Sequence, residues 1–158
     1  GGGETPSDGD NGNNGAGSQE TELSIKASDW VWGYNASVKD VEGGLEVTLS
    51  GDYGAASFGY DPEVDWSGKT LEITVKDYSN TSDSWVKVQV QNKDYLYGDS
   101  VKGLLCISKD KGGITGETVI SLPIASTEDG FDATKVNQIC VSGKANGDTF
   151  VITKCVLK

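Results

Sequence analysis

The chain of 158 residues contains no histidine, no methionine and no arginine, and these absences exclude several chemistries. Without histidine there is no Ser-His or Cys-His nucleophile pair, and the commonest metal ligand and general base near neutral pH is missing. Without arginine no side chain can form a two-pronged hydrogen bond to a phosphate or a carboxylate. The formal net charge of -11 opposes binding to nucleic acids and acidic lipids, which depends on clustered basic residues. We therefore expect neither nucleic acid nor a membrane as a partner.

Long apolar runs are absent as well. No stretch approaches the roughly 20 consecutive apolar residues of a membrane-spanning helix. Because residue 1 is glycine and not methionine, we expect the sequence to be a piece of a longer polypeptide. Such a piece carries no information on whether its parent has a signal peptide.

Residues 1–22 have the composition of a flexible linker. They contain seven glycines, five acidic residues, one alanine and no lysine. Such a segment cannot bury enough apolar surface to offset the entropy lost on ordering. Residues 23–158 hold all 13 lysines and 19 acidic residues, so their formal charge is -6, and their number suits one compact domain. The sequence thus predicts a linker over 1–22 and a single domain over 23–158.

From Leu23 onward, short runs rich in Val, Ile and Thr alternate with clusters of Gly, Asn, Asp and Ser. No long segment has a 3.6-residue period, and this pattern is typical of an all-β sandwich or barrel. Eight or nine strands in a domain of this length predict two packed antiparallel sheets. The predicted strands are residues 23–27, 45–50, 54–60, 70–76, 85–91, 103–108, 117–122, 136–142 and 149–157, with turns that include 61–63 and 144–148.

The run over 85–91 is the most informative of these strands. Its three valines alternate with a second row of side chains, Trp85, Lys87, Gln89 and Gln91, which would point to the opposite face. A sugar packs its C-H groups on an aromatic face, and carboxamides can donate to and accept from its hydroxyls. We therefore predict that this row binds a glycan. The alternative is an outer face whose tryptophan packs beneath a loop.

Residues 53–60 form a Gly/Ala-rich run, residues 64–76 an Asp-Trp-Ser-Gly turn followed by a core strand, and residues 85–91 the row described above. This succession resembles the jelly-roll, galactose-binding-like β-sandwiches of non-catalytic carbohydrate-binding modules, and residues 149–158 resemble their closing strand. The resemblance implies an all-β, two-sheet jelly-roll fold. It also implies a linker to a secreted polysaccharide hydrolase, which agrees with the composition of residues 1–22.

Two positions depart from that family pattern. Many relatives carry an acidic residue in the last strand that ligates a structural Ca²⁺, but the matching positions here are Thr153 and Lys154. We therefore expect no cofactor, with a structural calcium ion as the alternative. Trp66 occupies a turn position that is usually aliphatic in the family, so we expect it to pack in the core or at a corner.

Two further aromatic clusters are candidates for the rim of the binding site. If residues 30–34 are extended, Trp30, Trp32 and Tyr34 share one face, and in modules of this type the loop after the first strand borders the cleft. The alternative is a hydrophobic plug that closes the end of the sandwich. Tyr95 and Tyr97 follow the glutamine row directly and also alternate, which predicts a second rim.

The remaining reactive side chains favour neither a metal site nor catalysis. Cys106, Cys140 and Cys155 are dispersed and include no Cys-x-x-Cys pair, so we expect buried thiols, with a disulfide between Cys140 and Cys155 as the alternative. A glycosidase needs two carboxylates across a cleft, and the acids around residues 61–65 flank a proline in a predicted turn. We expect a protein that is not an enzyme.

These observations combine into one principal hypothesis. The chain is a monomeric, extracellular module that binds a neutral plant cell-wall polysaccharide, a β-1,4-glucan or a hemicellulose such as xyloglucan, mixed-linkage glucan, xylan or mannan. It thereby targets a linked glycoside hydrolase to its substrate. The competing hypothesis is a β-sandwich interaction or spacer domain without a glycan site.

Overall fold

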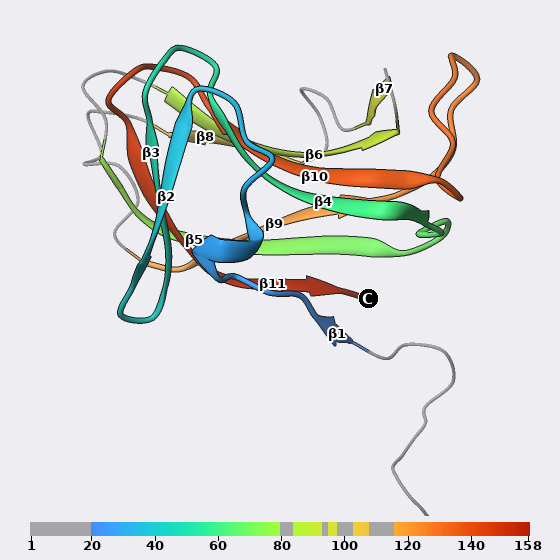
Figure 1. Ribbon diagram of the computed structural model, residues 1–158, viewed down its shortest axis with the longest axis horizontal. Helices are drawn as coiled ribbons and strands as arrows, with labels where there is room; N and C mark the ends of the chain where they lie inside the picture. Colours follow the sequence, from blue (N-terminus) through green and yellow to red (C-terminus); the bar gives the residue numbers. More distant parts are fainter. Residues whose placement is uncertain (1–19, 80–83, 93–94, 98–102, 108–115) are drawn as a thin grey trace, which may run out of the picture.

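The computed structural model describes residues 20–79, 84–92, 95–97, 103–107 and 116–158, with only the backbone described for 95–97 and 104–107. These residues form two packed antiparallel sheets and one short 3₁₀ helix, η1, over Ala27–Asp29 (Figure 1). The antiparallel β-sandwich expected from the sequence is confirmed. No helix in this part of the chain is long and apolar enough to span a membrane.

One layer is a six-stranded sheet. Its strands follow the order β2 (Ala36–Val41), β3 (Gly44–Leu49), β11 (Thr149–Leu157), β5 (Thr70–Ser79) and β9 (Thr118–Pro123), and β1 (Thr21–Glu22) also pairs with β11. The other layer is a five-stranded sheet. Its strands follow the order β4 (Ala55–Val64), β10 (Val136–Gly143), β6 (Ser84–Asn92) and β7 (Tyr95–Tyr97), and β8 (Leu104–Ile107) also pairs with β6.

The core lies between the sheets and is built by the alternation seen in the sequence. Val86, Val88 and Val90 of β6 are completely buried, as predicted. Burying one such side chain contributes on the order of 1.5–3 kcal/mol. Trp66 is also buried in the core, which confirms its expected packing role.

Three strand and turn predictions fail, each for its own structural reason. Residues 23–27 are not a strand, because the Ser24 hydroxyl accepts a hydrogen bond from the Lys26 backbone N–H and donates to Asp29, which favours the turn that enters η1. β2 was missed because it is an edge strand with no buried residue. The turn predicted at 61–63 is wrong, since these residues lie inside β4 at a register irregularity opposite β10. A proline lacks the ladder N–H and is tolerated at such an irregularity.

The first described strand lies at the end of the predicted linker. Thr21 and Glu22 pair with β11, and the Lys158 ammonium lies 3.5 Å from a Glu20 carboxylate oxygen and 3.1 Å from one of Glu72. β1 therefore overlaps the last two residues of the predicted linker, and residues 1–19 of that linker lie outside the described residues. β1 and the C-terminus lie together on the side of the sandwich away from β6 and β10 (Figure 1).

Candidate functional site

The outer face of the five-stranded sheet carries an ordered grid of side chains. Strand register places three rows across β4, β10 and β6: Ala55–Ser142–Lys87, Ser57–Cys140–Gln89 and Gly59–Gln138–Gln91. Neighbouring rows are two residues apart along each strand, or roughly 6.6–7 Å. The side chains are small on β4 and become longer toward β6. The sheet therefore supplies a floor with one high side.

On the β4 side of the floor, the segment that contains Trp32 and Tyr34 pairs with the edge of β4 and forms the opposite wall of the groove. The Trp32 N–H donates to the Ser57 carbonyl over 3.2 Å, and Tyr34 and Ala55 exchange backbone hydrogen bonds of 2.9 and 2.7 Å. These bonds hold the Trp32 and Tyr34 side chains above the floor, where they are 46% and 66% exposed.

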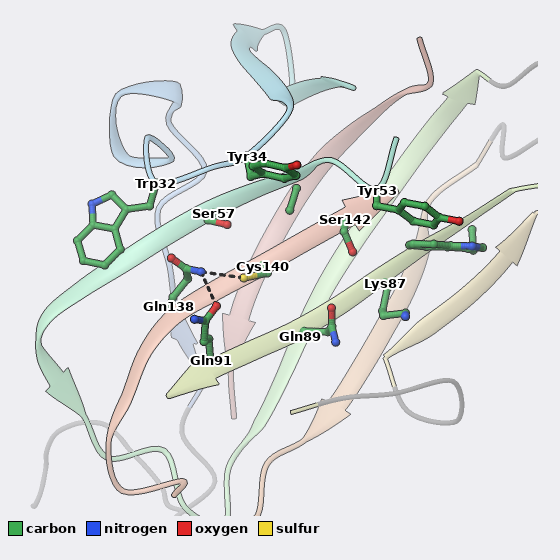
Figure 2. A pocket seen from close by; sticks show the side chains of 12 residues that line it. Trp32, Tyr34, Tyr53, Ser57, Lys87, Gln89, Gln91, Gln138, Cys140 and Ser142 are labelled. Carbon is green, nitrogen blue, oxygen red and sulfur yellow. Dashed lines mark hydrogen bonds between the residues drawn. The ribbon is translucent and has the colours of Figure 1, made fainter. Parts of the chain in front are cut away.

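Together these side chains enclose a groove of about 370 Å³ (Figure 2). It is lined by Trp32, Tyr34, Tyr53, Ala55, Ser57, Trp85, Lys87, Gln89, Gln91, Gln138, Cys140 and Ser142. In Figure 2, Trp32, Tyr34 and Tyr53 lie along one side of the groove, and the glutamines and Lys87 lie along the other. The groove therefore has an aromatic side and an amide side.

Gly59 determines how Trp32 sits at one end of the groove. A Cβ atom at Gly59 would lie 2.0 Å from the Trp32 ring, so the indole packs directly on the backbone of β4. Any larger residue would displace the ring. The Trp32 platform thus depends on Gly59, which lies two residues after Ser57, the backbone hydrogen-bond partner of Trp32.

The other end of the groove is built from three stacked groups. The rings of Tyr53 and Trp85 are stacked with centroids 6.1 Å apart and an angle of 27° between their planes, and the Lys87 ammonium lies 4.9 Å from the Trp85 ring centre. Trp85 is half-buried, whereas Tyr53 is 64% exposed. Tyr53 is therefore the outer plate of the stack and Trp85 supports it from behind. Trp85 and Gln91 are six residues apart on β6, so the two ends of the groove are separated by roughly 20 Å.

Hydrogen bonds orient the amide side. The Gln138 Nε2 donates to Gln91 Oε1 over 2.9 Å and to the Cys140 sulfur over 3.2 Å. Burial raises the pKa of the Cys140 thiol, so it stays protonated at neutral pH. Cys140 is therefore a neutral part of the floor and not a nucleophile.

The structure brings together six of the nine side chains predicted for the site: Trp32, Tyr34, Trp85, Lys87, Gln89 and Gln91. The prediction for Trp30 is wrong. It is 1% exposed, its Nε1 donates to the Ser24 carbonyl over 2.8 Å, and its ring packs edge-on against Phe58. The 3₁₀ turn before it breaks the alternation, so Trp30 faces the core while Trp32 faces the groove. Tyr95 and Tyr97 lie on β7 beside β6, but their side chains lie outside the described residues.

Half of the residues that line the groove were not predicted from the sequence. The missed residues are Tyr53, Ala55, Ser57, Gln138, Cys140 and Ser142. For those on β10 a signal existed, because the predicted strand 136–142 alternates polar residues with Ile139 and Val141, which are fully buried. For Tyr53, which precedes β4 in a loop, strand periodicity offers no signal.

The buried thiol expected at two cysteines is confirmed. Cys140 and Cys155 are free and buried on strands of different sheets, so the alternative disulfide is wrong, and the Cys106 side chain lies outside the described residues.

The residues present do not fit the calcium site that the family resemblance implies. Thr153 and Lys154 offer no carboxylate, and the buried Thr153 hydroxyl has no hydrogen-bond partner among the described residues. Within the described ranges, no group of three or more acidic or cysteine side chains could hold a metal ion.

Comparisons with known proteins identify the fold. No protein-family model and no curated protein matches the sequence. Among solved structures, a xylan-binding module, CBM15, superposes with a TM-score of 0.66 at 14% identity, over 89% of this chain and 96% of that chain. A mutant of a carbohydrate binding module of family 29 gives 0.60 at 20% identity, over 87% and 91%. Xylanase10C from Cellvibrio japonicus, in complex with xylopentaose, gives 0.58 at 13% identity, over 87% of this chain and 28% of that chain. The chain therefore has the β-sandwich fold found in carbohydrate-binding modules.

Proposed function

We propose that this domain is a non-catalytic module that binds a neutral, extended polysaccharide along the groove. The observation that carries the proposal is the pairing of an aromatic side with an amide side across a floor of small residues. Ring faces of a sugar chain pack on aromatic side chains, and its hydroxyls exchange hydrogen bonds with carboxamides. One structural neighbour, CBM15, is a xylan-binding module, which agrees with this ligand class.

The lining also argues against catalysis. None of the described residues that line the groove is an aspartate or a glutamate, whereas glycoside hydrolysis needs a pair of carboxylates at the scissile bond. Lys87 is the one lysine among them, and the domain as a whole is acidic. A neutral ligand suits this balance better than a polyanion.

The distance between the ends of the groove supports a chain ligand over a single sugar. A ligand that touches both Trp32 and Tyr53 must extend over roughly 20 Å. Each aromatic contact contributes on the order of 1–3 kcal/mol, which suggests affinities roughly in the micromolar to millimolar range after ordering costs. The ligands we favour are β-1,4-linked glucans and hemicelluloses such as xyloglucan, mixed-linkage glucan, xylan and mannan.

We further propose that the module is extracellular and targets a linked glycoside hydrolase. The match to one part of a xylanase chain supports this arrangement. The described chain begins and ends on the six-stranded sheet, in the layer opposite the groove, so a tether at either end leaves the groove face open.

Isothermal titration calorimetry and affinity electrophoresis against the favoured polysaccharides test the proposal. Wild type should bind at least one of them, and Trp32→Ala, Tyr53→Ala and Trp85→Ala should each weaken that binding. Val31→Ala is the matched control, because Val31 is 68% exposed next to Trp32 but does not line the groove. Failure of wild type to bind any of them contradicts the function. Binding that survives all three substitutions contradicts the site.

A further inference from the structure

A buried carboxylate lies beneath the Tyr53 end of the groove. Asp148 is 2% exposed, and its Oδ2 accepts hydrogen bonds from the Tyr78 hydroxyl over 2.9 Å and from the Ser84 hydroxyl over 3.0 Å. The two hydroxyl oxygens are themselves 2.9 Å apart. The three side chains come from β5, β6 and the start of the chain leading into β11, so the cluster joins both sheets at one end of the sandwich.

Burying a carboxylate has a desolvation cost that its hydrogen-bond partners must offset. A buried carboxylate loses its hydration, and two neutral hydroxyls replace only part of it. Asp148 takes part in none of the ion pairs formed within the described ranges. Burial raises the pKa of Tyr78, and the Asp148 carboxylate raises it further, so the phenol remains a hydrogen-bond donor.

The cluster connects the two halves of the aromatic stack. On one side, Ser84 directly precedes Trp85, whose backbone carbonyl lies 3.5 Å from the Tyr78 hydroxyl. On the other side, Asp148 closes the 144–148 turn, and the Lys144 carbonyl in that turn accepts the Tyr53 N–H over 3.0 Å. The distance between Tyr53 and Trp85 therefore depends on how this turn is held against the start of β6.

We propose that Asp148 is a positioning residue for the groove: by binding Tyr78 and Ser84 it fixes the 144–148 turn relative to β6 and so sets the stacking of Tyr53 on Trp85. This inference rests on the proposed function, since the stack matters as a platform for a sugar ring. Asp148 touches no ligand and acts only through the two rings.

A double-mutant cycle tests this role. Titrations of wild type, Asp148→Asn, Tyr53→Ala and the double variant with cellohexaose and xylohexaose should show a roughly five-fold loss of affinity for Asp148→Asn alone. In the Tyr53→Ala background the same substitution should change affinity less than about two-fold, because the platform is already gone. Equal losses in both backgrounds would overturn the proposal.

A second readout needs no ligand. The Trp85→Phe variant identifies the part of the near-ultraviolet circular dichroism spectrum that comes from Trp85. In the unliganded Asp148→Asn variant, this part of the spectrum should also be lost. Ile73→Val, which trims a fully buried residue of β5, is the control for destabilisation and should change neither the signal nor the affinity. If Asp148→Asn does not fold, Ser84→Ala removes one donor and should give a smaller effect of the same kind.

The two hypotheses fail in different ways. If wild type binds neither oligosaccharide nor any polysaccharide of the panel, the proposed function fails, and the dichroism still decides whether Asp148 positions the stack. If wild type binds while Asp148→Asn retains both full affinity and the wild-type signal, the positioning role alone is refuted.

Discussion

We expect the backbone conformation of Tyr53 to lower the free energy of unfolding, while its ring contributes to polysaccharide binding. Its φ is 58°, in the left-handed region that a bulky side chain rarely adopts. Within the described ranges, the other non-glycine residues with positive φ are Asn35 and Asp77, whose side chains tolerate this region better. Such a conformation costs on the order of 1–3 kcal/mol. Stacking on Trp85 returns only about 0.5–1.5 kcal/mol. The exposed ring therefore contributes little or nothing to stability.

Two substitutions separate the free-energy cost of the backbone conformation at Tyr53 from the contribution of its stacked ring. Tyr53→Asn and Tyr53→Ala both remove the stack, but asparagine tolerates the left-handed conformation better than alanine. We expect Tyr53→Asn to be more stable than Tyr53→Ala by about 1 kcal/mol, or about 2–6 °C in Tm by calorimetry. Both should lose polysaccharide affinity about five-fold or more, as expected for one aromatic contact.

The outcomes are independent of one another. Equal melting temperatures for the asparagine and alanine variants would refute the backbone strain at Tyr53. Wild-type affinity in both variants would refute its role as the outer plate. Tyr53→Phe keeps the ring and serves as the control, with stability and stacking close to wild type.

Further predictions concern the other platform and the response to alkali. Gly59→Ala should displace the Trp32 indole and weaken binding about as much as Trp32→Ala in the same titrations. Gly116→Ala is the control and should bind as wild type does, because a Cβ there meets no described residue within 4 Å. Unchanged binding by Gly59→Ala would count against the Trp32 platform. Burial raises the pKa of Cys155 from 9.0 to about 12 and also raises that of Tyr78, so the unfolded chain releases these protons at lower pH than the folded chain. The Tm should therefore fall as the pH rises from about 9 toward 12, and Cys155→Ala should reduce that slope; a Tm independent of pH over this range would contradict the burial of these protons.

The alternation of side chains along a strand predicted part of the fold and of the groove correctly and failed where the chain is not extended. Along β6 the alternation of valines with Trp85, Lys87 and the glutamines fixed both the core row and the groove row, because neighbouring side chains of a strand must point to opposite faces. The same rule would have identified Gln138 and Cys140 on β10. It failed at Trp30, where a 3₁₀ turn replaces the extended chain that the rule assumes.

A β-sandwich with one aromatic and amide-rich face follows from the amino-acid sequence, since hydrophobic alternation is a local property of each strand. Which segments meet across the sheet depends on the tertiary structure. It brought Trp32 onto Gly59 and Tyr53 onto Trp85, contacts that depend on strand order and register. It also joined Asp148 to Ser84, 64 residues away in the chain. The first two contacts follow from strand order within one sheet and the third from how the two sheets pack, and no periodicity within one strand encodes them.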